Sequence, residues 1–471
     1  MPYTNIPRHC GGKFASMQNL REREFSRLDA AGQAYLDYTG SGLYPESLIR
    51  EYSQWLTSSV YGNPHSLSPA SIASTHHVEA ARTAVLQFFN ASPDEYSVIF
   101  TLNASGALKL VGESYPFGPE SRFTLPIDNH NSVNGVREFA KARGAKVTYI
   151  PLDAQMRVAN LSLPEVNGSK HNLFAFPAQS NFSGVKYPLG WISSAHDVGY
   201  DVLLDAAAYV PTNALDLKKV SPDFVAISFY KMFGFPTGVG ALIAKHEALH
   251  KLHRPWFGGG TVRFVSAQNG VHLLKTSAEA FEDGTVNFLS IPAVTMGLNF
   301  LSKVGMNHIN GHVTGLNRLL LQDLLIPLHS NGGPLVKIYG PETTEGRGAT
   351  VSLNLLTPGG KELDYRLVEE QAIKEKISIR TGCFCNPGAA EAAYHYPAVQ
   401  AYKCFEQLSP GDFSIQQFSS CMSGKPVGAV RVSLGIASNE ADVQRFIKLL
   451  NQFRDYDEKL KPRIMPSMIG V

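Results

Sequence analysis

Residues 222–245 read PDFVAISFYKMFGFPTGVGALIAK, and the fold that we expect follows from this stretch. Its two apolar runs, 224–228 and 238–244, have the length and composition of short buried strands. The loop between them carries one lysine, Lys231, with aromatic residues on both sides. Such neighbours remove water from an amine, which lowers its pKa and raises the share of the neutral, nucleophilic form.

A carboxylate lies upstream of this lysine, at the end of another apolar run. Asp205 closes residues 202–204, and ligand sites in open α/β sheets lie at the carboxyl ends of the strands. Taken singly, a lysine after a strand is usually solvated, and an aspartate there usually caps a turn. Together they supply what pyridoxal phosphate requires, an amine for its aldehyde and an acid for its pyridine nitrogen. We therefore expect pyridoxal 5'-phosphate as the cofactor.

Composition excludes several other classes of protein. The chain has 471 residues, of which 44% are hydrophobic and 17% charged, and its net charge is +2 without any basic block. We therefore expect neither a nucleic-acid partner nor a membrane partner. The N-terminus lacks an apolar signal segment, and five unevenly spaced cysteines do not form a disulfide framework. These features predict reduced cysteines and a cytoplasmic protein.

The order of the expected elements predicts an α/β fold. Strands alternate with helices through residues 95–245, which favours a mostly parallel central sheet with helices on both faces. We expect three parts along the chain: an N-terminal arm at 1–45 that contributes to a small domain, a large cofactor-binding domain at 46–305, and a small C-terminal α/β domain at 306–471.

Small and polar residues follow several of the expected strands. Residues 103–106 lead from a strand into a helix whose N-terminus favours a phosphate, although Asn103 or Ser105 acting as a plain helix cap is an alternative. His130 follows another strand and is placed to stack on a flat ring, whereas a loop histidine is more often simply exposed.

A second group of unusual residues lies in the C-terminal third. Residues 380–388 (RTGCFCNPG) hold two cysteines in a loop with glycine and proline, and no second cysteine pair completes a metal site. A cysteine on a mobile loop beside Arg380 is a candidate nucleophile, and a partly buried structural cysteine is the alternative. Arg431 interrupts an apolar run, and a substrate carboxylate suits its planar guanidinium.

Five motifs carry a family resemblance over residues 30–455: SFYKMFGFPTGVGALI, FGGGT, FEDGTVNFLSI, RTGCFCNPGA and GKPVGAVRVSLG. The chain resembles the class V, fold-type I pyridoxal phosphate enzymes that include cysteine desulfurases. Within them it is most similar to the N-terminal domain of molybdenum cofactor sulfurases. The resemblance implies a homodimer, and we expect the C-terminal MOSC domain of full-length sulfurases to be absent.

The resemblance also implies how the cofactor is held. Lys231 would hold the aldehyde, Asp205 would pair with the pyridine nitrogen, and His130 would stack on the ring and carry protons. The further contacts that it implies are Ala104, Ser105, Ser228 and Tyr230 to the phosphate, Asn181 with Gln179 to the phenolic oxygen, and the partner subunit's Thr285 to the phosphate.

The activity that the resemblance implies is the removal of sulfur from L-cysteine. Cys385 would carry the sulfur as a persulfide, Arg431 and Arg380 would bind the substrate carboxylate, and L-alanine would be released. Cys383 is a neighbouring thiol without an essential role. The acceptor is left open and includes a molybdenum cofactor on another protein. The alternatives are a pyridoxal phosphate C–S lyase or aminotransferase that acts on another sulfur-containing amino acid, and a non-catalytic partner of a sulfur-transfer protein.

Overall fold

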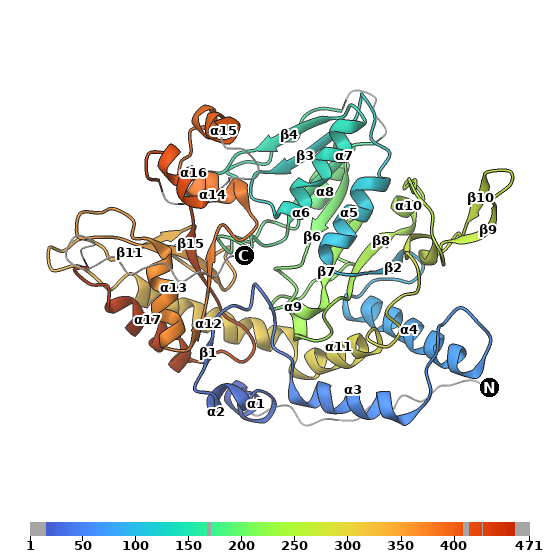
Figure 1. Ribbon diagram of the computed structural model, residues 1–471, viewed down its shortest axis with the longest axis horizontal. Helices are drawn as coiled ribbons and strands as arrows, with labels where there is room; N and C mark the ends of the chain where they lie inside the picture. Colours follow the sequence, from blue (N-terminus) through green and yellow to red (C-terminus); the bar gives the residue numbers. More distant parts are fainter. Residues whose placement is uncertain (1–15, 167–170, 408–413, 426, 457–471) are drawn as a thin grey trace.

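The structure is a computed structural model that places two sheets side by side, the larger one on the right in Figure 1. It describes residues 16–456 without 167–170, 408–413 and 426, so residues 1–15 of the expected arm lie outside the described part. The domain boundaries proposed from the sequence stay predictions.

The larger sheet has seven strands and is mostly parallel, which confirms the expected fold class. β8 runs antiparallel to both of its neighbours, and the remaining pairs are parallel. The spatial order is β2 (Tyr96–Thr101), β8 (Gly240–Lys245), β7 (Phe224–Ser228), β6 (Asp201–Asp205), β5 (Leu173–Pro177), β3 (Arg122–Pro126) and β4 (Lys146–Ile150).

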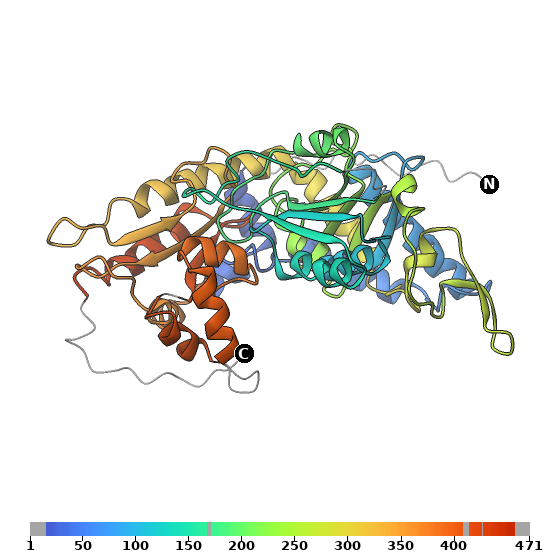
Figure 2. The same ribbon diagram turned by 90° about the horizontal axis from the view of Figure 1, so that it is seen from above.

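Each central strand of this sheet buries both of its faces. In β7, Val225 and Ile227 belong to one core, and Phe224 and Ala226 belong to the other. Because side chains alternate along a strand, burial on both faces produces the continuous apolar runs seen in the sequence. Figure 2 shows helices on both sides of the sheet. The first core includes residues of α4 (Pro69–Phe88) and α11 (Pro292–Val304), and the second includes residues of α5 (Ala104–Ser114) and α7 (Val136–Ala142).

The smaller sheet is antiparallel and also contacts the N-terminal segment. Its order is β11 (Val336–Tyr339), β12 (Thr350–Leu355), β15 (Ala429–Ser433) and β14 (Arg380–Gly382). A short parallel pair, β1 (Ala34–Tyr35) with β13 (Ile377–Ser378), continues into a bridge between Asp37 and Ser433. This path carries Asp37 to the edge between the two sheets. Around the smaller sheet lie α12 (Met306–Leu324), α13 (Tyr365–Lys374) and α17 (Glu440–Asn451).

The remaining elements are one hairpin and several helices. The hairpin consists of β9 (Val262–Ser266) and β10 (Val271–Leu274), and α6 (Asn131–Asn134) directly precedes α7. The others are α1 (Met17–Glu24), α2 (Arg27–Ala30), α3 (Glu46–Ser58), α8 (Trp191–Asp197), α9 (Phe229–Phe233), α10 (His246–Leu249), η1 (Ala278–Phe281), α14 (Pro387–Ala393), α15 (Ala398–Gln407) and α16 (Ile415–Cys421).

One disulfide corrects the expectation of reduced cysteines. Cys404 of α15 is bonded to Cys421 of α16, and Cys383 and Cys385 are free and exposed. The pair lies in a small apolar cluster that also contains Phe418 and Met422. The sequence did not indicate this pair because the two cysteines lie on different helices, 17 positions apart, and their proximity depends on how these helices pack.

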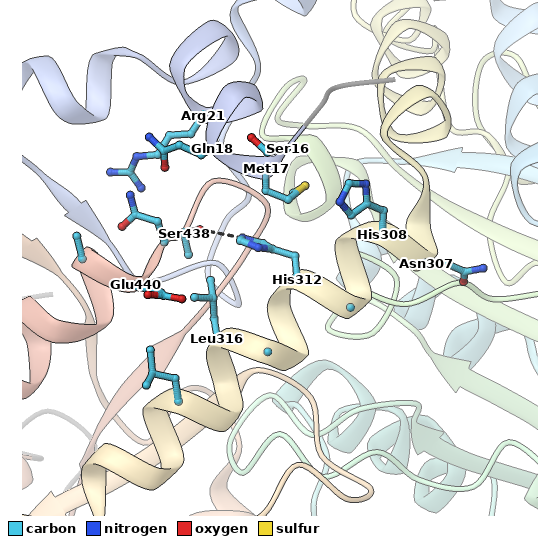
Figure 3. Close-up of a pocket in the computed structure, with 15 residues that line it drawn as sticks. Ser16, Met17, Gln18, Arg21, Asn307, His308, His312, Leu316, Ser438 and Glu440 are labelled. Carbon is cyan, nitrogen blue, oxygen red and sulfur yellow. Dashed lines mark hydrogen bonds between the residues drawn. The ribbon is translucent and has the colours of Figure 1, made fainter. Parts of the chain in front are cut away.

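A buried ion pair joins the N-terminal helix to α17. The Arg21 guanidinium bonds to Asp442 at 2.5 Å and to Asp29 at 2.8 Å, and the Arg21 and Asp442 side chains are 3% and 4% exposed. The pair borders a cavity of ≈ 1080 Å³ between α1, α12 and the start of α17, where His312 Nε2 bonds to the Ser438 carbonyl at 2.9 Å (Figure 3). No residue of the sequence-predicted site lines this cavity.

Replacing Arg21 tests whether this pair holds the N-terminal segment in place. Arg21→Met leaves the Asp442 carboxylate buried without its main partner, which costs about 3 kcal/mol or more. We expect a clear fall in the denaturant midpoint, whereas Arg23→Met, on the exposed side of the same helix, should leave it unchanged. An equal midpoint for both variants would contradict the importance of the pair.

Candidate active site

The candidate active site is a cavity at the carboxyl ends of the parallel strands of the larger sheet. The loops that follow β2, β3, β5, β6 and β7 all contribute to its wall. The structure brings together nine of the sequence-predicted residues here: Ala104, Ser105, His130, Gln179, Asn181, Asp205, Ser228, Tyr230 and Lys231.

Lys231 lies on α9, directly after β7, and lines this cavity. Burial lowers the pKa of Lys231, Asp205 opposes that shift, and Arg431 and Arg380 add to it. Phe229 and Phe233 on the same helix are buried in the core of the larger sheet and do not line the cavity. The amine therefore carries a larger neutral, nucleophilic fraction than a solvated lysine.

The N-terminus of α5 forms one end of the cavity. Asn103 caps the helix with its side chain, and the Ala104 backbone N–H donates to Ser228 Oγ at 2.8 Å. The hydroxyl groups of Ser105 and Ser132 are 2.5 Å apart beside it. Backbone N–H groups and hydroxyls at a helix N-terminus suit a phosphate. Asn103 acts as the plain helix cap that was the alternative, and phosphate binding at this helix N-terminus stays a prediction.

His130 has a defined tautomer. The Ser132 backbone N–H donates to His130 Nδ1 at 3.1 Å, so Nδ1 is an acceptor and the neutral ring carries its proton on Nε2. Burial lowers the pKa of His130 below its ordinary 6.5; Asp205 acts against this shift, and Lys231 and Arg431 act with it. At neutral pH the imidazole is therefore uncharged.

Two guanidinium groups face each other across the strands β14 and β15. Arg380 and Arg431 are register partners, and both bond to the Asp37 carboxylate, at 2.8 Å and 3.1 Å. Arg431 also donates to the Asn181 carbonyl at 3.0 Å and lies 4.7 Å from the centre of the Phe384 ring. Burial lowers the pKa of Arg431 to about 10, and its buried Nε has no hydrogen-bond partner. Two cations that share one anion leave positive charge for a substrate carboxylate.

Asp37 is a site residue that the sequence analysis missed. Its signal was present, because Asp37 is an acid that closes an apolar run at 34–36, the same pattern that drew attention to Asp205. Its partners lie more than 340 positions away in the chain, so the sequence did not indicate what it binds.

The cysteine loop lies against the large domain. The Asn131 backbone N–H donates to the Cys385 carbonyl at 2.7 Å, and Asn181 Nδ2 donates to the Phe384 carbonyl at 2.7 Å. Both Phe384 and Cys385 have left-handed backbones, with φ of 57° and 55°. These bonds attach two consecutive loop residues to the large domain and bring the Cys385 backbone beside Asn131, the residue after His130. The mobility expected of the loop stays a prediction.

Thr285 is not part of this cavity. It is exposed, accepts a hydrogen bond from Asn63 at 3.1 Å, and lines a separate cavity with Thr101, Leu102 and Gly106. That cavity lies on the other side of the loop between β2 and α5. Thr285 of one chain therefore does not reach the residues that the sequence assigned to the same phosphate.

The residues present fit pyridoxal 5'-phosphate. Lys231 supplies an amine with a lowered pKa, Asp205 supplies a buried carboxylate, and the N-terminus of α5 supplies the phosphate cradle. Arg431, expected to bind a substrate carboxylate, does not line this cavity, and its buried Nε is without a hydrogen-bond partner. Among the described residues, no three His, Cys, Asp or Glu side chains are grouped so that they could hold a metal ion, and no helix there is long and apolar enough to cross a membrane.

The lowered pKa of His130 predicts a pH effect on stability. The native pKa lies below the unfolded value of about 6.5, so the unfolded chain binds more protons as the pH falls through this range. His130 should therefore destabilise the native state below pH 6.5 and have no such effect above it. We expect the unfolding midpoint of His130→Gln to fall less steeply between pH 7 and pH 5.5 than that of the wild type. A difference that stays constant across the whole range would contradict this assignment.

Comparison with known proteins places this site in a family. The class V aminotransferase model matches residues 34–446. The molybdenum cofactor sulfurase of Arabidopsis thaliana is 36% identical to this chain, with 92% of this chain and 58% of the relative covered. The chain thus spans little more than half the length of the curated relatives it matches.

Two solved structures share the fold. An apo cysteine desulfurase from Thermococcus onnurineus NA1 has a TM-score of 0.74 and 24% identity, with 92% of this chain and 97% of that chain covered. A cystine C–S lyase in complex with its product cysteine persulfide has a TM-score of 0.67 and 18% identity, with 92% and 100% covered. With the family model matching most of its length and the lysine, carboxylate and helix terminus in one cavity, the chain belongs to the class V aminotransferase family.

Proposed function

We propose that the protein is a pyridoxal phosphate-dependent cysteine desulfurase, which takes sulfur from L-cysteine and holds it as a persulfide on Cys385. The observation that carries the proposal is the attachment of the Cys385 loop next to His130, beside the cavity that contains Lys231. A lyase or an aminotransferase needs the lysine but has no use for a thiol at this position.

The residues divide the work between the two sheets. Arg431 and Arg380 of the smaller sheet bind the substrate carboxylate, with Asp37 balancing one of the two positive charges. At the larger sheet, Lys231 removes the Cα proton and returns it, since burial makes its neutral amine available. The bound cofactor supplies the electron sink that makes this proton acidic.

The sulfur transfer needs no external oxidant. The Cys385 thiolate attacks the substrate sulfur, the bond between that sulfur and Cβ breaks, and a new S–S bond forms on Cys385. The Cβ atom gains a proton, so L-cysteine and the enzyme thiol become L-alanine and the enzyme persulfide. The exposed position of Cys385 then allows an acceptor to collect the sulfur. The name of the relatives points to a molybdenum cofactor as the acceptor, on another protein or domain.

Replacing each of the two loop cysteines with serine, one at a time, tests this assignment. With L-cysteine as the only substrate, we expect Cys385→Ser to form no loop persulfide and to release no alanine, because the sulfur has no acceptor thiol. Cys383→Ser is the matched control, since it changes a free thiol in the same loop, and it should keep both products. Alkylation followed by mass spectrometry of the loop peptide detects the persulfide, and amino-acid analysis detects alanine. Continued release of sulfide with pyruvate in Cys385→Ser would favour the C–S lyase instead.

We also propose a homodimer in which the partner subunit's Thr285 completes the phosphate site. The separate cavity of Thr285 supports this, because it adjoins the same loop from the outer side and includes the 72% exposed Leu102. An exposed leucine beside a phosphate loop is suited to contact with a second copy. The cytoplasmic location expected from the sequence stays a prediction.

The dimer is tested through cofactor retention. A phosphate hydrogen bond from Thr285 is worth roughly a tenfold change in cofactor affinity, so Thr285→Ala should release the cofactor more readily on dilution. Thr276→Ala is the control, because this exposed hydroxyl accepts a bond from Arg263 on the hairpin and lies outside both cavities. Sedimentation should give a dimer mass for the loaded protein. A monomer with full cofactor affinity would rule the arrangement out.

A further inference from the structure

Asp128 is a fully buried carboxylate to which the sulfur chemistry assigns no role. It follows β3, is 0% exposed, and accepts three hydrogen bonds. Ser180 Oγ and Asn386 Nδ2 donate to Oδ1 at 2.8 Å and 2.6 Å, and the Tyr187 hydroxyl donates to Oδ2 at 2.8 Å. Burial raises the pKa of Asp128, and these three donors oppose the shift. Because a buried carboxylate is costly without such donors, the group depends on all three for its place in the core.

One of these donors belongs to the cysteine loop. Asn386, also 0% exposed, is the residue directly after Cys385. Both hydrogens of its amide nitrogen are used, one by Asp128 and one by Asn181 Oδ1 at 2.9 Å. Its Oδ1 accepts from the Ala389 backbone N–H at 3.1 Å and so caps α14. A single side chain therefore fixes the loop to the large domain and to its own helix.

The loop backbone needs such support. Left-handed backbones at two successive residues that are not glycine, Phe384 and Cys385, cost of order 1–2 kcal/mol each. The large domain holds this conformation with two hydrogen bonds. Asn181 Nδ2 donates to the Phe384 carbonyl, and the Asn131 backbone N–H donates to the Cys385 carbonyl. The Phe384 ring is buried and contacts the Phe182 ring, with 5.5 Å between centroids. The backbone that carries the Cys385 thiol is thus held by contacts with the large domain.

We propose that Asp128 and Asn386 are positioning residues for sulfur transfer. They hold the Cys385 loop on the cofactor cavity in one conformation, so the thiol meets the substrate sulfur by side-chain rotation and the loop does not leave the large domain. This inference rests on the proposed desulfurase function for the reaction that it serves, while the attachment itself is a property of the chain alone. It also requires the sulfur acceptor to approach the attached loop.

The first test replaces the carboxylate with its isosteric amide. Asp128→Asn has one acceptor oxygen in place of two and sets an NH₂ group against the donors of Ser180, Tyr187 or Asn386. Amide hydrogen exchange in a peptide covering residues 380–389 should become at least tenfold faster. Persulfide formation in a single turnover should fall by about 10²-fold, as expected when a nucleophile is misplaced by about 1 Å. At saturating cofactor and saturating L-cysteine, cofactor absorbance should match the wild type, so that a lower transfer rate reports the position of the thiol and not loss of the cofactor.

Asp201→Asn is the matched control. Asp201 accepts bonds from the Tyr115 hydroxyl at 2.7 Å and from Lys251 Nζ at 2.6 Å, but it lies at the opposite end of the parallel strands. This variant also removes a carboxylate bonded to a tyrosine, so it reports any general loosening of the large domain. It should leave loop exchange and the transfer rate unchanged.

A second variant tests the pair from the loop side and remains informative if Asp128→Asn does not fold. Asn386→Asp keeps the cap on Ala389 but sets two carboxylates against each other, so loop exchange should rise more than in Asp128→Asn. Combining the two substitutions restores an amide opposite a carboxylate. The double variant should therefore regain part of the slow hydrogen exchange and part of the persulfide-formation rate.

The proposal is overturned if amide hydrogen exchange in residues 380–389 is unchanged in the single variants. It is also overturned if that exchange becomes faster while the persulfide-formation rate stays at the wild-type value. If the wild type forms no persulfide, the proposed function fails, and loop exchange still decides the attachment.

Discussion

The Asp37 carboxylate, placed between two guanidinium groups, is the contact on which the geometry of the site depends. It accepts from Arg380 and Arg431, which lie opposite each other on neighbouring strands of the smaller sheet. Without a shared anion, the buried Arg431 guanidinium and the half-exposed Arg380 guanidinium would repel each other in this register. Asp37 therefore stabilises this register. Its bridge to Ser433 also places the N-terminal segment alongside the same sheet.

That register also determines where the reactive thiol lies. β14 contains only residues 380–382, and the cysteine loop begins at the next residue. Because strand side chains alternate, a slip of one residue would turn Arg380 away from Asp37 and shift the start of the loop. The contact of Asp37 with Arg380 and Arg431 thus determines both the register of the two guanidinium groups and the start of the Cys385 loop. Under the proposed function, the same contact positions the substrate carboxylate and the thiol.

Sequence patterns identified the residues whose environment is local. Lys231 and Asp205 end apolar runs, and a buried strand can be recognised from the run itself. Asp128, Asn386 and Asp37 did not stand out, because each is recognised only by its partners, and Asn386 is 258 positions away from Asp128. The same reason explains the unexpected disulfide and the contacts of the cysteine loop with the large domain.

The role of Asn181 shows how the two halves of the site are connected. The resemblance assigned it to the phenolic oxygen of the cofactor, and the structure gives its Nδ2 a bond to the Phe384 carbonyl. An amide nitrogen has two hydrogens, so this bond leaves one for the cavity that Asn181 lines. Its Oδ1 is meanwhile occupied by Asn386. The group that faces the cofactor cavity is therefore the same group that supports the cysteine loop, and displacing the loop must also turn this amide. Any free energy that a ligand gains from Asn181 depends on an attached loop, and the linkage must act equally in the reverse direction.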